Sequence, residues 1–263
     1  MAMKICRFRL REHANVSSPP LYGLLEDDEL REITGLPWQG WTAGSRKWAV
    51  DQVRLVAPVE PSKIVCVGRN YAAHAVELGN EIPNEPLLFL KPASSIVGPD
   101  EPIVLTPLSQ RVEHEGELAL VVGRKCSHLK DDDDALSFLA GYTCLNDVTA
   151  RDIQKSDVQF TRGKGFDTFC PIGPWIETKL DPRDVLVELR VNGSLRQAGQ
   201  TSLMLYPCAY LVRWISHMMT LYPGDVIATG TPAGVGPLVA GDVVEVSIEG
   251  VGMLRNPVHA SQS

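Results

Sequence analysis

The sequence lacks several features that would place it in other classes of protein. No apolar run approaches the ~20 residues that span a bilayer, so we expect no contact with a membrane. The first residues, MAMKICRFRLREH, carry charges where a secretory signal needs an apolar stretch, which predicts a cytoplasmic protein. Basic residues are not in excess either, because 25 Lys and Arg stand against 32 Asp and Glu and give a net charge of −7. Phosphate contacts need a basic face, so this balance argues against a nucleic-acid binder.

Cysteine spacing typical of metal or redox motifs is also missing. The chain has 263 residues and six cysteines, none of them in a CxxC arrangement. Most lie among apolar neighbours, which predicts buried, reduced thiols and no disulfide framework. These residues are Cys6, Cys66, Cys126, Cys144, Cys170 and Cys208.

Short strand patterns dominate what is present. Residues 4–10 and 21–25 are expected as strands around a turn-rich segment, and residues 46–53 as a weak helix. Two prolines between residues 56 and 62 mark a boundary. We therefore expect a small N-terminal domain at residues 1–57 and a second domain at residues 58–263.

The second domain alternates strands with a few helices. Strands are expected at residues 63–67, 87–90, 103–105, 116–123, 142–145, 185–191, 226–229 and 243–248. Helices are expected at residues 71–78 and 131–140, after residue 147 up to 159, and over a long apolar pattern that begins at residue 202. The sequence therefore predicts a mainly β protein with α-helices (α+β), in which a mixed sheet forms a roll or barrel.

Glu115 and Glu117 enter the strand GELALVVG two residues apart. Alternation along a strand puts them on one side and His114 on the other. Two parallel, half-buried carboxylates repel each other unless a cation is present, and oxygen ligands favour Mg²⁺, Mn²⁺ or Ca²⁺. The alternative is a solvent-facing pair at the start of a strand. Asp147, which follows another strand, could be the third carboxylate or a simple helix cap.

Three further motifs carry polar side chains at helical or turn positions. Arg151 and Gln154 share one helix face and could contact a carboxylate substrate. Lys164 lies between two glycines, on exposed backbone that can approach a ligand or simply form a surface loop. His74 and Glu77 are three residues apart on a short helix, as in a general base or an exposed pair. The glycine-rich turn at residues 229–236 lacks GxGxxG spacing and is not a dinucleotide site.

Taken together, the motifs GRNYAAHAVELG, FLKPASSIVG, HEGELALVVG, NDVTARDIQ, KGFDTFCPIGPW and PGDVIATGTPAGVGP occur in an order that resembles the fumarylacetoacetate hydrolase family. The resemblance covers about residue 60 to the end and implies a β-roll, a homodimer and a bound Mg²⁺ or Mn²⁺. It implies metal ligands at Glu115, Glu117 and Asp147, and catalytic roles for His74, Glu77 and Lys164. Substrate contacts are implied at Arg69, Tyr71, Arg151, Gln154 and Thr231, and the His74–Glu77 pair is implied to lie on a mobile segment. Glycines and prolines around a short helix make residues 69–86 the candidate lid, which we expect to become ordered when an oxalate-like ligand binds.

Family substrates are 2-oxo or 2,4-dioxo acids. The leading hypothesis is a metal-dependent hydrolase that cleaves a carbon–carbon bond of an acylpyruvate-type 2,4-dioxo acid through a metal-stabilised enolate. Lys164 would add a donor at the developing oxyanion. An oxaloacetate-type decarboxylase or a 2-hydroxyhepta-2,4-diene-1,7-dioate isomerase on the same scaffold is the second hypothesis. A non-catalytic protein that binds an oxoacid is a third, from a different class.

Overall fold

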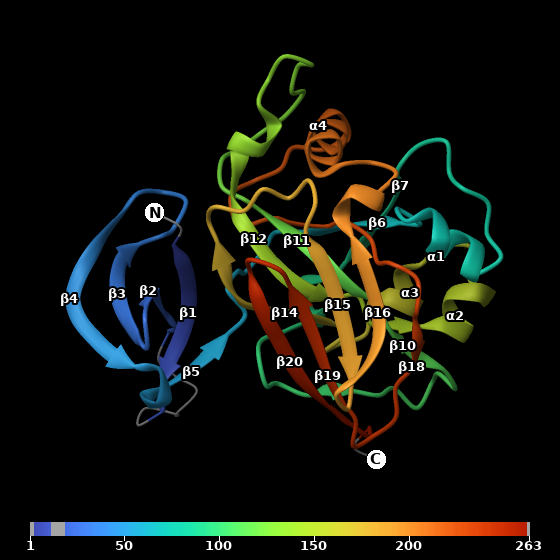
Figure 1. Cartoon of the computed structure of the whole chain (residues 1–263), viewed down its shortest axis with the longest axis horizontal. Helices are drawn as coiled ribbons and strands as arrows, with labels where there is room; N and C mark the ends of the chain where they lie inside the picture. The colour runs from blue at the N-terminus through green and yellow to red at the C-terminus, as the bar shows by residue number, and fades with distance from the viewer. Residues whose placement is uncertain (1–2, 12–18, 262–263) are drawn as a thin grey trace.

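The structure is a computed structural model that describes residues 3–11 and 19–261. Strands are the main secondary structure and form three sheets, and the described residues also contain four short α-helices (Figure 1). This confirms the predicted mainly β fold with few helices. Within the described residues, no helix is long and apolar enough to cross a membrane.

A small antiparallel unit forms the N-terminal part and appears as blue strands at the left of Figure 1. Its elements are β1 (Lys4–Leu10), β2 (Leu21–Glu26), β3 (Glu29–Gly35), β4 (Trp41–Ala49), the 3₁₀ turn η2 (Val50–Gln52) and β5 (Val53–Val56). β1 also pairs with β14 (Cys170–Glu177), so the unit shares the main sheet. The division at residue 57 stays a prediction.

The expected helix at residues 46–53 is wrong. Residues 46–49 belong to β4, in which Trp48 pairs with Leu30 of β3, and the 3₁₀ turn η2 follows. Trp48 also packs edge-on against Phe8, with ring centroids 5.5 Å apart. Pairing and packing across the small sheet outweigh the weak local preference for a helix.

The twelve-stranded sheet continues through the larger part of the chain. From β14 its order is β12, β11, β17, β6 and β7, and β8 pairs with β14. The bounds are β6 (Ile64–Gly68), β7 (Leu87–Lys91), β8 (Ile96–Val97), β11 (Gly116–Val122), β12 (Leu139–Asn146) and β17 (Val226–Ala228). Every residue of β11 is buried, so this strand lies in the middle of the fold.

Two smaller sheets complete the architecture. The first has the order β16 (Ser194–Gln200), β15 (Leu186–Val191), β19 (Val243–Ile248), β20 (Gly252–His259) and β9 (Ile103–Val104). It packs against β11, β12 and β14, and the largest apolar core lies between the two layers. The second joins β13 (Thr149–Ala150), β10 (Val112–His114) and β18 (Gly236–Pro237). Asn192 and Gly193 form the hairpin turn between β15 and β16, as is typical of an Asn-Gly pair that follows a strand.

The helices are shorter than the sequence predicts. They are α1 (Ala72–Glu77), α2 (Arg151–Ser156), α3 (Thr161–Lys164) and α4 (Cys208–Met218), with 3₁₀ turns η3 (Ala93–Ser95), η4 (Ala135–Phe138) and η5 (Thr201–Leu203). The helix expected at residues 131–140 is only η4, because residues 139 and 140 join β12. The helix expected from residue 202 begins at Cys208, since Pro207 disfavours helical geometry just before it.

Candidate active site

The candidate site lies at one edge of the twelve-stranded sheet. β11 begins at Gly116, directly opposite Asn146 at the end of antiparallel β12. This register brings Glu115 and Glu117 beside Asp147, and Asp147 N donates to Glu115 O at 2.8 Å. β17 is antiparallel to β11 and parallel to β6, so the segments after β17 and β6 leave the sheet at the same edge.

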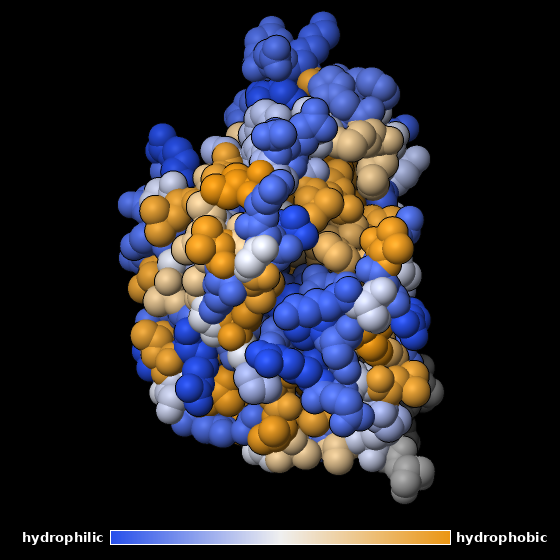
Figure 2. Space-filling model, turned by 90° about the vertical axis from the view of Figure 1, so that its right-hand side faces the viewer, coloured by the Kyte–Doolittle hydropathy of each residue, from blue (hydrophilic) through white to orange (hydrophobic). Residues whose placement is uncertain are grey.

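A cavity of about 410 Å³ opens at this edge. It faces the side of the molecule where α1, α2 and α3 lie, a mixture of hydrophobic and hydrophilic surface in Figure 2. Nine of the eleven predicted site residues line it: Arg69, His74, Glu115, Glu117, Asp147, Arg151, Gln154, Lys164 and Thr231. The other two are Glu77, which contacts His74, and Tyr71, whose buried hydroxyl has no hydrogen-bond partner in the part of the chain that the structure describes.

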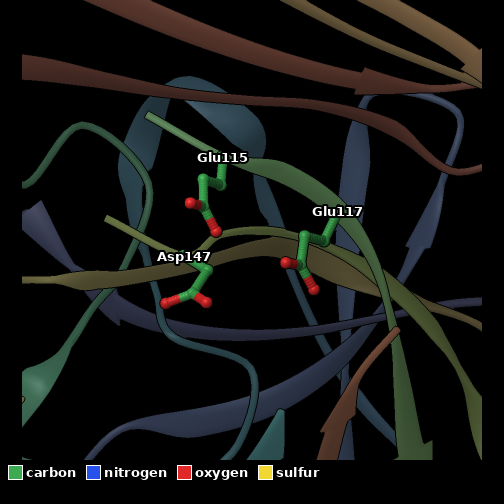
Figure 3. A group of neighbouring side chains, drawn as sticks. All are labelled: Glu115, Glu117 and Asp147. Atoms are coloured by element: carbon green, nitrogen blue, oxygen red, sulfur yellow. The ribbon is translucent and has the colours of Figure 1, made fainter. Parts of the chain in front are cut away.

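Three carboxylates converge inside the cavity (Figure 3). One oxygen from each of Glu115, Glu117 and Asp147 lies within 4.8 Å of the other two. The residues are only 4%, 2% and 1% exposed, respectively. Three buried carboxylates at this separation repel one another, so the arrangement needs positive charge nearby.

Two buried lysines supply part of that charge. Lys164 Nζ donates to Glu115 Oε2 at 2.7 Å and to Asp147 Oδ2 at 2.6 Å. Lys91 Nζ donates to Asp147 Oδ1 at 2.7 Å. Burial alone would lower the pKa of Lys164, but Asp147 and Glu115 outweigh it and raise the pKa. Lys164 is 2% exposed at the end of α3, so the expectation that it lies on exposed backbone is wrong, because these ion pairs draw it inward.

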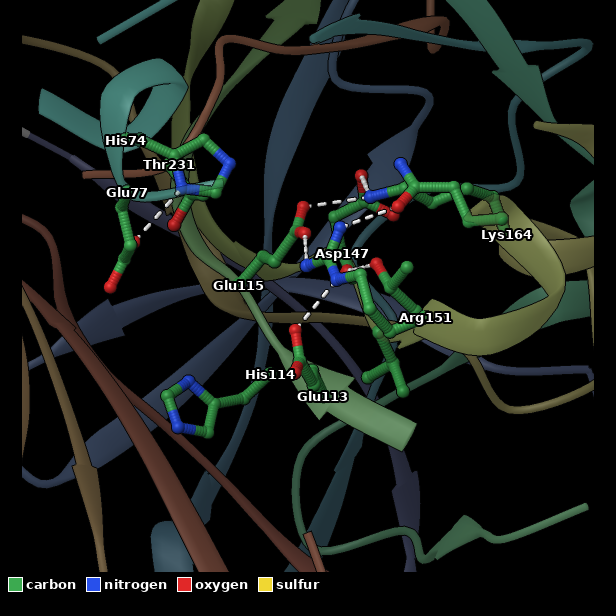
Figure 4. A network of polar contacts seen from close by, with 12 residues as sticks. His74, Glu77, Glu113, His114, Glu115, Asp147, Arg151, Lys164 and Thr231 are labelled. Carbon is green, nitrogen blue, oxygen red and sulfur yellow. Dashed lines mark hydrogen bonds and ion pairs between the residues drawn. The ribbon is translucent and has the colours of Figure 1, made fainter. Parts of the chain in front are cut away.

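Arg151 supplies a third buried cation from the start of α2 (Figure 4). Its Nε donates to Glu113 Oε2 at 2.6 Å, its Nη1 to Gln154 Oε1 at 2.6 Å, and its Nη2 to Glu115. Burial acts to raise the pKa of Glu115, but Lys164 and Arg151 hold it below its ordinary value. A guanidinium has five N–H groups, so two remain for a ligand in the cavity.

Glu117 is the carboxylate that these cations do not reach. Its Oε2 accepts the backbone N–H of Gly230 at 2.8 Å, and no ion pair joins it to any described residue. Burial, together with Asp147 and Glu115, raises the pKa of Glu117 well above its usual value. A divalent cation held by the three carboxylates would supply the missing charge. The all-oxygen donor set fits Mg²⁺, Mn²⁺ and Ca²⁺.

His74 and Glu77 lie on α1 at the wall of the same cavity. His74 is 5% exposed, and its Nδ1 is 3.4 Å from Glu77 Oε2. The Glu77 carboxylate in turn accepts the N–H of Gly234, at 3.0 and 3.1 Å to its two oxygens. The pair is therefore held between α1 and the turn after β17, with His74 buried in the cavity wall and Glu77 exposed to solvent.

The sequence did not predict a site role for three buried polar residues, which are Lys91, Glu113 and Gln197. Lys91 and Glu113 fix Asp147 and Arg151, as described above. Gln197 of β16 donates to Thr231 Oγ1 at 2.7 Å and accepts from Gly116 N at 3.0 Å. Lys91 could have been identified from the sequence, because it is a charged residue at the end of the apolar strand LLFLK. Gln197 gives no such signal, because its contacts depend on the packing of two sheets.

His114 contacts Gln197 behind the site and is not part of the carboxylate cluster. It points away from the cluster in Figure 4, as the alternation predicts, and its Nδ1 is 3.1 Å from Gln197 Oε1. Burial lowers the pKa of His114. The histidine therefore supports the packing behind the site.

Comparisons with known proteins give a consistent result. The family described as fumarylacetoacetate (FAA) hydrolase C-terminal matches residues 63–259, and the family described as Rv2993c-like, N-terminal matches residues 3–58. Protein Rv2993c of Mycobacterium tuberculosis is 51% identical over 231 residues, 87% of each chain. Human mitochondrial oxaloacetate tautomerase FAHD2A is 46% identical over 79% of this chain and 70% of its own length.

The solved structure of 5-carboxymethyl-2-hydroxymuconate delta-isomerase from Mycobacterium smegmatis is also similar. It superposes with a TM-score of 0.90 at 44% identity, over 98% of this chain and 100% of that one. The match to the family covers well over half of the sequence, and the relatives share both the sequence and the fold. The chain belongs to the fumarylacetoacetate hydrolase family of enzymes.

Proposed function

We propose that this chain is a divalent-metal-dependent enzyme that acts on a 2-oxo acid at the Glu115–Glu117–Asp147 cluster. The observation that carries the proposal is the buried Glu117 carboxylate, which forms no ion pair with any of residues 3–11 and 19–261, in a cavity that also holds a histidine. A bound Mg²⁺ or Mn²⁺ would supply Lewis acidity for the 1-carboxylate and 2-oxo group of the substrate.

The protein's own residues would bind and orient the substrate. Arg151 has two N–H groups left for a carboxylate oxygen. The ammonium of Lys164 binds Glu115 and Asp147. It can also donate a hydrogen bond to the substrate oxygen on which negative charge develops. Gln154 and Thr231, both at the cavity wall, would complete the contacts.

His74 would move the proton. With Glu77 accepting at Nδ1, the free nitrogen Nε2 is the basic one, and Glu77 is itself held by Gly234. This base would take a proton from carbon next to the 2-oxo group, or from a water molecule. Removal of the proton from carbon gives tautomerisation or isomerisation. Removal of a proton from water gives hydrolysis of a carbon–carbon bond.

Both outcomes have support. The names of the human and M. smegmatis relatives describe a tautomerase and an isomerase, which favours proton transfer at carbon. Hydrolysis of an acylpyruvate-type 2,4-dioxo acid, the leading hypothesis from the sequence, uses the same dyad on a water. We place proton transfer first and hydrolysis second.

One experiment separates them. Protein loaded with Mg²⁺ or Mn²⁺ is incubated in D₂O with oxaloacetate, acetylpyruvate or fumarylpyruvate and followed by proton NMR. A tautomerase accelerates deuterium uptake next to the 2-oxo group, a hydrolase releases pyruvate and a second acid, and a decarboxylase releases CO₂. Incubations without protein give the uncatalysed rates.

His74→Ala is the test variant, and His217→Ala, on the exposed end of α4, is its matched control. We expect His74→Ala to lose at least about 100-fold in rate while it keeps its metal-dependent thermal stabilisation. Full activity in His74→Ala would refute the proton-transfer role. Binding of the acids without any turnover would support the non-catalytic alternative.

The homodimer implied by the family stays a prediction, for which light scattering should give twice the 28.8 kDa of one chain.

A further inference from the structure

The buried side chain of Gln197 uses every hydrogen-bonding group of its amide. Gln197 lies on β16 and is 1% exposed. Its Nε2 donates to Thr231 Oγ1 and to Pro232 O, both at 2.7 Å, and its Oε1 accepts from Gly116 N at 3.0 Å. The same oxygen lies 3.1 Å from His114 Nδ1, which carries the ring hydrogen because an amide oxygen only accepts. A buried amide bonded in this way fixes the relative positions of the groups that it joins.

Three of these residues close a ring of hydrogen bonds. Gly116 N donates to Gln197, Gln197 donates to Thr231 Oγ1, and Thr231 Oγ1 donates to Gly116 O at 2.8 Å. Each residue in the ring donates once and accepts once, so the direction of every bond is determined. Gly116 is the residue between Glu115 and Glu117. The ring therefore fixes the backbone between two of the three carboxylates of the cluster.

The ring also holds the glycine-rich turn after β17, residues 229–236. In this turn Gly230 N donates to Glu117 Oε2 at 2.8 Å. Gly234 N donates to the carboxylate of Glu77, at 3.0 and 3.1 Å to its two oxygens. One short turn thus anchors a carboxylate of the cluster and the acidic member of the histidine–glutamate pair. A displacement of the turn would move both.

The turn lies directly against β16, with glycine at both points of close approach. Gly234 has a φ of +106°, and a Cβ on it would lie 2.0 Å from Arg196 O. A Cβ on Gly199 would lie 2.6 Å from Pro232 Cβ. Only glycine permits backbone to approach so closely. Gln197 lies between these two points on β16 and supplies the polar contacts of the same interface.

From these contacts we propose that Gln197 is a positioning residue, which holds the 229–236 turn on the start of β11 and so sets the geometry of the metal-binding carboxylates. The inference rests on the proposed function and adds a residue to it. Gln197 is not among the described residues that line the cavity, so it acts through Gly116 and Thr231 and not by contact with a substrate. Replacement of a residue that orients metal ligands from behind typically changes metal affinity by about 10- to 100-fold.

The test opens the ring at two different members. Gln197→Met removes the amide from a side chain of similar size, and Thr231→Val removes the hydroxyl but keeps the shape. Both variants and their double variant are compared with wild type and with Gln200→Met, the matched control. Gln200 lies on the same strand, and its side-chain oxygen has no hydrogen-bond partner among the described residues. Dissociation constants for Mg²⁺ and Mn²⁺ are measured by calorimetry at a temperature at which circular dichroism shows each variant to be folded.

We expect Gln197→Met and Thr231→Val each to weaken metal binding by about 10- to 100-fold, while Gln200→Met binds as wild type does. The double variant should bind about as weakly as Gln197→Met, because either change alone opens the same ring. Thr231→Ser keeps the hydroxyl and should keep the affinity of wild type. If Gln197→Met does not fold, the comparison of Thr231→Val with Thr231→Ser decides the question.

Hydrogen exchange without metal gives a second readout, which does not depend on activity. Peptides that span residues 229–236 should exchange at least about tenfold faster in Gln197→Met than in wild type or Gln200→Met, because the turn opens more readily. A general loss of stability would instead speed exchange in β11 and β12 to the same extent. Exchange confined to the turn therefore separates positioning from a role in overall stability.

Three results would overturn the inference alone. They are wild-type metal affinity in folded Gln197→Met, additive effects of the two single changes, and exchange that becomes faster evenly over the whole chain. Additive effects would mean that the two side chains act separately and share no ring. If wild type binds neither Mg²⁺ nor Mn²⁺, the proposed function itself fails and this inference falls with it.

Discussion

Lys91 Nζ lies 2.7 Å from Asp147 Oδ1, and the two side chains are 0% and 1% exposed. The same ammonium donates to Val148 O at 3.2 Å, so it fixes both the carboxylate and the backbone that follows β12. Lys164 holds the other oxygen of Asp147, so both oxygens of this carboxylate are bound by buried ammonium groups. Glu115 is held in the same way, by Lys164 and Arg151.

Replacement of Lys91 by Met should destabilise the protein strongly. It leaves Asp147 with one cation fewer in a buried site, and loss of one partner of a buried pair typically costs about 3–5 kcal/mol of unfolding free energy. Unfolding in urea measures this. Lys91→Met/Asp147→Asn should recover part of the loss, since no unpaired charge remains. Strict additivity of the two changes would contradict the coupling, and Lys155→Met serves as the exposed control.

Glu117→Gln should separate metal binding from stability. The variant loses a carboxylate that has no cationic partner, so without metal it should melt at no lower temperature than wild type. Saturating Mg²⁺ or Mn²⁺ should stabilise wild type, by about 2.7 kcal/mol at a hundredfold excess over Kd, and the variant far less. Thermal melts with EDTA and with metal measure both effects.

The matched control for that change is Glu245→Gln, which is half-exposed on β19. It removes the same charge far from the cavity and should keep the metal-dependent shift. A Glu117→Gln protein that gains as much stability from metal as wild type would show that Glu117 is not a ligand.

The six cysteines should be unreactive in the folded protein. All are free and buried, which confirms the expectation from the sequence. Burial raises the pKa of Cys126 to about 11 and that of Cys6, Cys144, Cys170 and Cys208 to about 12, and also raises that of Cys66. Since the thiolate is the nucleophile, we expect no rapid reaction with Ellman's reagent at pH 8 and six thiols in urea. Fast release of one equivalent by native protein would contradict this.

Asp225→Ala should weaken the contact between the segments that precede β6 and β17. The buried Asp225 carboxylate accepts from Ser62 Oγ at 2.7 Å, from Lys63 Nζ at 2.5 Å and from Tyr222 N at 2.8 Å. Its loss leaves these donors unpaired, and we expect about 3–5 kcal/mol less stability in urea. Asp132→Ala, on an exposed turn, should change stability by less than about 0.5 kcal/mol. Similar effects of the two changes would refute this role.

The sequence by itself determined the strands and the chemistry of the cluster. Strand alternation and the turn at Asn192-Gly193 are local properties, so they could be predicted. The same alternation put Glu115 and Glu117 on one side of β11. The family resemblance supplied Asp147 as the third carboxylate. These assignments depend on residues that are close in sequence or on motifs in a fixed order.

Only the tertiary structure decided where the charges are balanced. It placed Lys91 and Lys164 on Asp147, and it left Glu117 without an ion pair among the described residues. These contacts join strands and helices that are distant in the sequence, and no local pattern encodes them. The same reason explains the overpredicted helices, because pairing and packing between distant segments outweighed weak local preferences.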